Sequence, residues 1–262
     1  MKFHVAFLPP AIGAAIGAAL LTACSSVPIK GSTTVPVKGS TAIPIKGSTA
    51  GYIIPEDTYS PNRRYGVVVP VFDEKTMTEG SEKNQIIELK SKRVVVDIDG
   101  DRPGYNRTLN HHDMGVASWS ADSSVLLWDV DGKWCPDLIA MVKLEDGKAK
   151  WQLDLLHTAQ RATLGRTRKA KPERYAAVKK ENAGDGSAYP DGFTVDVVIP
   201  GGEGSPISLP LAVQVNLTAN PKGIESYPYD LDSYLDGIVN EEGTFVVKSF
   251  HLGPRPGGNG RW

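Results

Sequence analysis

Trp119-Ser120-Ala121-Asp122-Ser123-Ser124, followed by Val125-Leu126-Leu127-Trp128-Asp129-Val130, is the stretch that decides the fold. The small polar residues predict a tight turn, because their side chains hydrogen-bond to nearby backbone groups. The apolar run after them predicts a buried strand, and Asp131-Gly132 supplies the next turn. The stretch therefore predicts antiparallel β-structure, in which short turns join neighbouring strands.

The same alternation of turn and strand extends in both directions along the chain. Upstream, residues 60–65 form a polar turn before the apolar run 66–72. Further β-strands bounded by turn residues are predicted at residues 86–89, 93–98, 139–144 and 149–153. The first two of these strands are expected to form a hairpin.

A helix is predicted after Asp154, which can cap the apolar pattern that begins at Leu155. The helix is expected to end or kink near Pro172, and a second helical piece is predicted over 173–182. Alternating apolar residues then predict strands at 193–199, 207–217 and 244–250, of which the last two could pair. Pro210 within the second run favours an edge strand or a bulge there.

The predicted fold class is α+β, with mostly antiparallel sheet. We expect two partial blade-like or meander units, and one long or kinked basic helix packed on a C-terminal sheet. The globular region is expected over 52–252, with lobes at 52–153 and 154–252, followed by a disordered tail over 253–262 that is rich in Gly and Pro.

The segments Ser60-Pro61-Asn62-Arg63-Arg64-Tyr65 and Trp119–Val125 resemble the Ser-Pro-Asp-Gly-Lys turn of bacterial β-propeller repeats of the TolB and WD40-like kind. Asn62 replaces the usual Asp in the first copy, and Ala121 and Ser123 replace Pro and Gly in the second. A closed propeller needs at least about four blades. The resemblance therefore implies the local turn and strand, and it transfers no catalytic residue.

The N-terminus predicts a secretory signal peptide over residues 1–23, since a weakly basic start precedes an apolar run. The uninterrupted apolar piece Ala11 to Leu21 is shorter than the roughly 20 residues that a membrane-spanning helix needs. Pro9-Pro10 would break a longer helix. A cleaved leader is therefore favoured over a permanent membrane span.

Leu21-Thr22-Ala23-Cys24 closes this run and resembles the lipobox of bacterial lipoproteins. The resemblance covers residues 1–26 and implies that Cys24 becomes the first residue, acylated with two or three chains. Ser25 resembles the sorting signal for the outer membrane. Ordinary secretion with a coincidental cysteine is the alternative.

Three octapeptide copies follow Cys24, with lysines at Lys30, Lys38 and Lys46. Each copy combines a proline with Gly-Ser-Thr, which predicts a flexible tether over 24–51 with an average reach of roughly 30 Å. The alternative is that the lysines bind anionic lipid or cell-wall polymer, or that the repeats add to a sheet edge.

The most basic part of the chain lies in the predicted helices. Arg161, Arg166, Arg168, Lys169 and Lys171 are the candidate residues for contact with an anion or a partner. They would bind phosphate-rich lipid, lipopolysaccharide or acidic glycan. A solvated helix face, partly neutralised by the acidic C-terminal third, is the structural alternative.

One cluster has metal-ligand chemistry, namely His111, His112 and Asp113, with Asp97, Asp99 and Asp101 upstream. Its spacing matches neither a His-Glu-x-x-His site nor a calcium loop, so a polar turn explains it equally well. Cys135 would have no intramolecular partner if Cys24 is lipidated, and we expect it to be a buried thiol.

The chain has 29 basic and 30 acidic residues, which argues against a nucleic-acid binder. The sequence favours a non-catalytic binding or structural lipoprotein without a cofactor, anchored by lipid and facing the periplasm. Its partner would be a protein or polymer of the cell envelope. One alternative is an envelope hydrolase or metal-dependent enzyme that uses the His111 region. The other is an interaction module that contacts anionic polymer or lipid through the basic helix.

Overall fold

The computed structural model describes residues 52–70, 83–98, 115–131, 136–181, 190–202, 204–218 and 231–257. These ranges hold three four-stranded sheets and two α-helices, and neighbouring strands are antiparallel throughout. The predicted α+β class with mostly antiparallel sheet is therefore confirmed.

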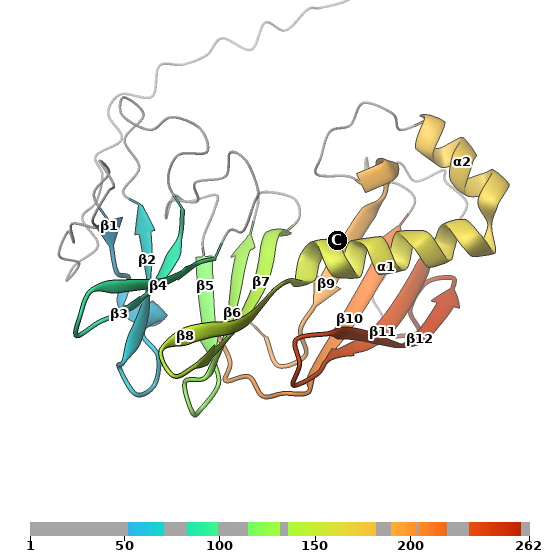
Figure 1. The fold of residues 1–262 in the computed structure, drawn as a ribbon. Coiled ribbons are helices and arrows are strands. Elements are labelled where there is room, and N and C mark those ends of the chain that lie inside the picture. The colour runs from blue at the N-terminus through green and yellow to red at the C-terminus, as the bar shows by residue number, and fades with distance from the viewer. Residues whose placement is uncertain are drawn as a thin grey trace, which may run out of the picture. The chain divides into compact units, whose positions relative to one another are not determined.

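Two of the sheets are meanders in chain order (Figure 1). The first contains β1 (Tyr52–Ile53), β2 (Tyr65–Pro70), β3 (Gln85–Glu88) and β4 (Arg93–Asp97). The second contains β5 (Gly115–Trp119), β6 (Val125–Asp131), β7 (Pro136–Glu145) and β8 (Lys148–Asp154).

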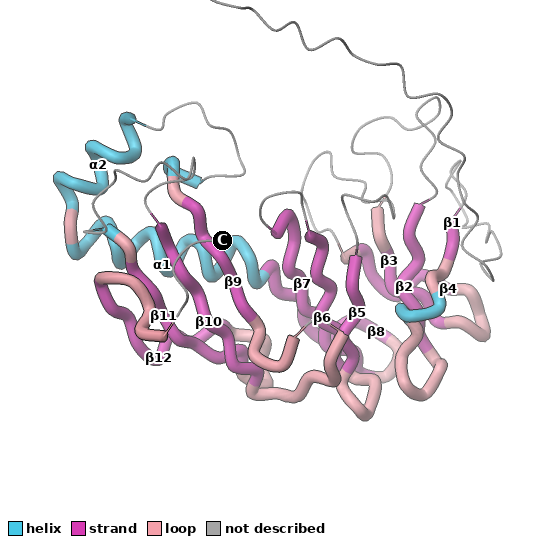
Figure 2. The backbone as a smooth tube through the Cα atoms, turned by 180° about the vertical axis from the view of Figure 1, so that it is seen from behind, coloured by secondary structure: helices cyan, strands magenta, loops and turns pink. Residues whose placement is uncertain are grey.

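The third sheet has the strand order β12-β11-β10-β9 (Figure 2). Its strands are β9 (Thr194–Val198), β10 (Leu211–Thr218), β11 (Ser233–Val239) and β12 (Phe245–Leu252). The helices α1 (Leu155–Ala170) and α2 (Pro172–Glu181) precede it, and short 3₁₀ turns lie at η1 (Glu56–Thr58) and η2 (Pro190–Gly192).

The second sheet is buried on both faces. Leu126 and Trp128 of β6 join a core shared with the first sheet, whereas Leu127, between them in sequence, joins a core shared with α1 and the third sheet. In β7, Ala140 belongs to the core shared with the first sheet, and Met141 belongs to the core shared with α1 and the third sheet. Successive side chains of a strand point to opposite faces, so a strand covered on both sides needs an uninterrupted apolar run.

The first sheet packs one face on the second sheet. Tyr65 stacks on Trp119 with 6.3 Å between ring centroids, and the Trp119 indole N–H donates to the carbonyl of Thr58 at 3.0 Å. The other face carries a smaller buried cluster, which contains Tyr52, Val68 and Ile87. The two sheets therefore differ in how much apolar packing surrounds them.

The polar turns before β2 and β6 have the same hydrogen bonds. Ser60 N donates to Tyr65 O at 2.9 Å, and Ser120 N donates to Val125 O at 2.8 Å. Ser60 Oγ accepts from Tyr65 N, and Ser120 Oγ accepts from Val125 N. The two turns also touch, because Asn62 N donates to Ser123 Oγ at 3.1 Å.

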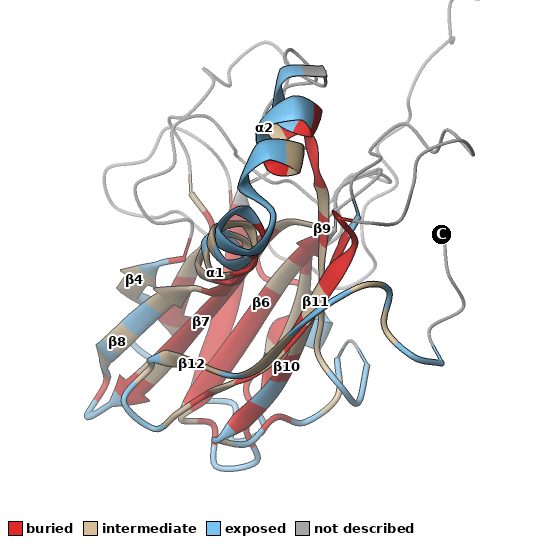
Figure 3. Cartoon of the chain, turned by 90° about the vertical axis from the view of Figure 1, so that its right-hand side faces the viewer, coloured by how far each residue is buried: buried red, intermediate tan, exposed pale blue. Residues whose placement is uncertain are grey.

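The helix α1 packs on the third sheet, as predicted (Figure 3). Asp154 caps it by accepting a hydrogen bond from His157 N at 3.0 Å, and Leu155, Leu156 and Ala159 are buried. Lys171 N closes the last turn on Thr167 O, and α2 begins at Pro172, where a proline needs no intrahelical donor.

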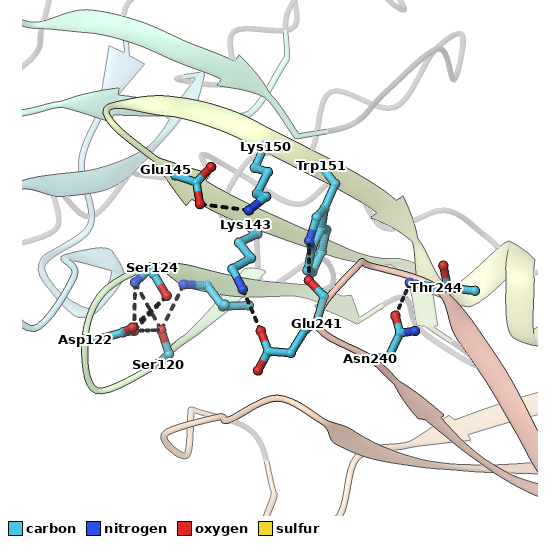
Figure 4. Close-up of polar contacts among 11 residues, drawn as sticks. Ser120, Asp122, Ser124, Lys143, Glu145, Lys150, Trp151, Asn240, Glu241 and Thr244 are labelled. Atoms are coloured by element: carbon cyan, nitrogen blue, oxygen red, sulfur yellow. Dashed lines mark hydrogen bonds and ion pairs between the residues drawn. The ribbon is translucent and has the colours of Figure 1, made fainter.

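The β7–β8 hairpin also contacts the turn between β11 and β12 (Figure 4). Lys143 Nζ lies 2.6 Å from a carboxylate oxygen of Glu241, and the Trp151 indole N–H donates to Glu241 O at 3.0 Å. Gly243 has a positive φ of 74° and lies against the Trp151 ring, where a side chain would overlap it. The second and third sheets are therefore joined by polar contacts as well as by a common core.

The structure corrects four details of the sequence interpretation. Strands β1, β5 and β11 lie where none was predicted. The predicted pairing of 244–250 with 207–217 is wrong, because β12 pairs with β11. Strand β10 begins only after Pro210, and it lies between β9 and β11 rather than at an edge. Ile207 instead donates its backbone N–H to Trp119 O at 3.2 Å.

Candidate functional site

The exposed side of α1 and α2 is the candidate site. Arg161 and Arg168 are seven residues apart, which is about two helical turns, so they point the same way. We define the basic helical surface as the exposed basic residues of this segment: Arg161, Arg166, Arg168, Lys169, Lys171, Lys179 and Lys180. Figure 3 shows the outward sides of both helices as exposed.

The buried side of α1 holds this surface in place. Two threonine hydroxyls bond back to the helix, Thr163 Oγ1 to Ala159 O at 2.9 Å and Thr167 Oγ1 to Thr163 O at 3.0 Å. The Thr167 hydroxyl also lies 2.8 Å from the Ser233 hydroxyl of β11. Because these contacts are buried, they fix the rotation of α1 about its own axis and its position along the sheet.

The second helix is fixed by an aromatic side chain. Tyr175 is buried and stacks on Phe193 with 4.7 Å between ring centroids. Its hydroxyl donates to Asp191 Oδ2 at 2.6 Å, and Lys179 Nζ lies 2.6 Å from Asp191 Oδ1. One carboxylate therefore binds α2 to η2 and neutralises one lysine of the basic helical surface.

These contacts shift the protonation equilibria of both partners. Burial, and then the contact with Asp191, raise the pKa of Tyr175 far above its ordinary value, so the hydroxyl remains a donor. Partial burial raises the pKa of Asp191, but the hydrogen bonds from Lys179 and Tyr175 outweigh burial, and the pKa falls below its ordinary value of 3.8. Asp191 therefore carries its negative charge at neutral pH.

The other cations form no ion pair within the described ranges, although the charge of Arg168 also helps to lower the pKa of Asp191. Arg161 bonds to the Thr158 hydroxyl at 3.5 Å and Arg166 to Ala162 O at 3.1 Å, so both bind neutral groups. For Arg168, Lys169 and Lys171, no ion pair forms with any described carboxylate. Arg168 and Lys169 lie in the last turn of α1, where cations stabilise the helix dipole.

Gly165 leaves room in the middle of these cations. It lies four residues from both Arg161 and Lys169, and a Cβ placed on it would meet no atom within 4 Å. Side chains four apart on a helix are neighbours. Arg161 and Lys169 therefore lie about one helical turn before and one after an open position, on a helix whose other side is fixed to the sheet.

The other residues singled out in the sequence are placed less completely. Cys24, Asp99, Asp101, the His111-His112-Asp113 cluster and Cys135 lie outside the described residues. Asp97 ends β4, and its Oδ1 accepts from Gln85 Nε2 at 2.7 Å. Within the described part of the chain, no group of three or more His, Cys, Asp or Glu side chains could hold a metal ion.

The sequence indicated the cations of the basic helical surface but gave no indication that Asp191 contacts them. The only available signal was the turn sequence Pro190-Asp191-Gly192, which says nothing about contact with α2. No helix in the described ranges is both long and apolar enough to cross a membrane. No protein-family model matches the chain, and no curated protein matches its sequence.

Proposed function

We propose that this chain is a lipid-anchored, non-catalytic binding protein of the cell envelope, held by acylated Cys24 and the octapeptide tether. In this proposal the domain contacts anionic envelope polymer or lipid head groups through the basic helical surface. It faces the periplasm, with the anchor in the outer membrane.

The observation that supports a binding role is a set of exposed cations on a helix whose opposite side is buried against the third sheet. The chain as a whole has a formal net charge of only −1, so the positive charge is a local property of this surface. Each Lys or Arg near an anionic membrane surface contributes about 1 kcal/mol to binding. Several cations on a rigid helix therefore suit a repeated or multivalent anion better than a single small one.

The test compares charge reversal on this surface with charge reversal elsewhere. Arg166→Glu combined with Lys169→Glu should lower retention on anionic vesicles or on cell-wall sacculi by at least about tenfold. Lys148→Glu combined with Lys248→Glu changes the net charge equally, at exposed positions on β8 and β12, and should leave retention unchanged. Equal retention of the natural protein and the helix variant would refute the proposed surface.

Gly165 offers a second, milder pair. Gly165→Ala should preserve retention, because the position is open, and should stabilise the helix by up to about 1 kcal/mol. Gly165→Glu places a carboxylate among Arg161, Arg168 and Lys169 and should weaken retention. About 0.5 M salt should remove the difference between these two variants, because it screens exposed charges.

The anchor is tested separately. Cells that express the natural sequence should incorporate labelled palmitate into the protein, and cells that express Cys24→Ser should not. Equal labelling of the two would remove the assigned lipidation site while leaving the vesicle result intact.

A further inference from the structure

Arg255 lies on the face of the third sheet that α1 does not cover. In β11, the odd-numbered residues such as Leu235 belong to the core under α1, and Tyr234 and Asp236 therefore point to the opposite face. After β12 the chain turns at Gly253, whose φ is 96° and whose N–H donates to Asp232 O. This turn directs residues 254–257 back toward the strands they follow.

The guanidinium of Arg255 has a partner at each of its three nitrogens. Nε donates to Asn216 Oδ1 at 2.9 Å, one terminal nitrogen to Asp236 Oδ1 at 2.7 Å, and the other to Leu235 O at 3.0 Å. The carbon Cζ also lies 4.5 Å from the centroid of the Tyr234 ring. A carboxylate, two neutral acceptors and an aromatic face together match a planar cation with five donors.

The groups around this guanidinium are held by contacts that do not involve Arg255. Asp236 Oδ2 accepts from the Ser249 hydroxyl at 3.0 Å, and the Tyr234 ring stacks on His251 with 4.9 Å between centroids. A β-bulge lies at the same place, since Asp236 pairs with Ser249 but Gly237 pairs with Val247. The receptor groups are therefore positioned by the sheet itself, in advance of the cation.

The described part of the tail is attached mainly through this one side chain. Pro254, Pro256 and Gly257 are exposed, whereas Arg255 is partly buried. A Cβ placed on Gly253 or on Gly257 would meet no atom within 4 Å. The tail thus binds the sheet as a short peptide binds a receptor, with one side chain supplying most of the specific contacts.

We propose that this face of β10 and β11 is a guanidinium-binding site, whose ligand class is the arginine side chain of an extended peptide, and that Arg255 is its resident ligand. An arginine on another polypeptide can occupy the site once Arg255 leaves it. Tethering gives Arg255 a high effective concentration, so an incoming peptide must compete with it. This site is independent of the basic helical surface, which lies on the other side of the sheet and takes anions.

The test uses the full chain with Arg255→Ala, and a synthetic peptide with the sequence of residues 253–257, acetylated and amidated. The variant should bind this peptide, and the natural protein should bind it at least about tenfold more weakly because its own Arg255 competes. A peptide with Lys in place of Arg should bind the variant at least about tenfold more weakly. A single ammonium group cannot donate hydrogen bonds in the planar arrangement of the three guanidinium nitrogens.

The control for the receptor is Asp236→Asn combined with Arg255→Ala, which keeps the side-chain shape but removes the charge. It should lose peptide binding while unfolding at the same temperature as Arg255→Ala alone. The proposal is overturned if Arg255→Ala binds no peptide even at the highest peptide concentration used, or if it binds the Arg and Lys peptides equally. It is also overturned if adding Asp236→Asn to Arg255→Ala leaves peptide binding unchanged.

Discussion

The first and second sheets begin their inner strands with the same turn, but they use a different acceptor in it. In the first turn Asn62 Oδ1 accepts from Arg64 N at 2.9 Å, and in the second Asp122 Oδ1 accepts from Ser124 N at 3.0 Å. Both turns also place a non-glycine residue at positive φ, 52° at Arg63 and 64° at Ser123. A neutral amide and a carboxylate thus support one geometry, so the turn needs an acceptor oxygen rather than a charge.

The two sheets differ more in what covers them than in how they begin. The second sheet lies between two large apolar cores, whereas among the described residues the outer face of the first sheet carries the smaller cluster around Tyr52 and Val68. Similar local chemistry therefore starts strands whose contributions to stability should be unequal. Three pairs of substitutions test this comparison.

The largest difference is expected for buried isoleucines. Ile139 in β7 and Ile87 in β3 are both almost fully buried, at 0% and 1% exposure. Ile139→Ala should lower the free energy of unfolding by about 4 kcal/mol, and Ile87→Ala by about 2 kcal/mol, because the smaller cluster can relax into the cavity. Urea denaturation measures both values, and equal losses would contradict the difference between the sheets.

A smaller effect is expected for the serines that open each turn. Ser120 Oγ accepts from the backbone N–H groups of Ser124 and Val125, whereas Ser60 Oγ accepts from that of Tyr65. Each Ser→Ala change should cost about 1–3 kcal/mol, since it leaves a buried donor unpaired, with the larger loss at Ser120.

Ser208→Ala is the matched control for these serine changes. Ser208 is exposed, and its replacement should change stability by less than about 0.5 kcal/mol. A loss at Ser60 or Ser120 no larger than the loss at Ser208 would show that the hydroxyls do not hold the turns.

The smallest effect is expected for the charge that distinguishes the turns. Hydrogen bonds from Ser120 and then Ser124 lower the pKa of Asp122 below its ordinary value of 3.8. A carboxyl whose pKa is lower in the folded state stabilises the protein above pH 3.8, and this stabilisation is lost as pH falls through the folded pKa. Asn62 has no such dependence.

Asp122→Asn should therefore flatten the acid limb of the stability curve while leaving stability near neutral pH within about 1 kcal/mol, because the group is exposed. Asn62→Asp should steepen the same limb. Thermal unfolding at about pH 3 and pH 7 measures both variants. Identical pH profiles of the two variants and the natural protein would show that the acceptor's charge has no role.

The sequence predicted the parts of the fold that depend on local chemistry. Both turns, the strands they start and the helix cap at Asp154 follow from neighbouring residues. The missed strand β1 is only two residues long, whereas the missed strands β5 and β11 each have a glycine at an inward position, where an aromatic ring lies on the backbone. A side chain at Gly115 would overlap Trp128, and a Cβ on Gly237 would lie 2.6 Å from the Phe245 ring. Such strands lack the apolar alternation that identifies a strand.

The sequence indicated which cations make up the candidate site, but not that Asp191 contacts one of them. The cations of α1 and α2 are visible as a run of basic residues, and helical spacing shows which of them point together. The contact of Lys179 and Tyr175 with Asp191 requires η2 to lie beside α2, which only the tertiary structure decides. The guanidinium site of Arg255 was missed for the same reason, since its groups come from three strands and the tail.

The double coverage of the second sheet has a consequence for how the protein is made. Strands β5 to β8 leave the ribosome before the residues of α1 and β9–β11 that bury Leu127, Ile139 and Met141 have been synthesised. A nascent chain at that stage has one side of this sheet in water, and an exposed apolar sheet of this kind aggregates readily. A chaperone that binds the exposed sheet of the nascent chain can therefore dissociate only after the whole polypeptide, and not just its first half, has been synthesised.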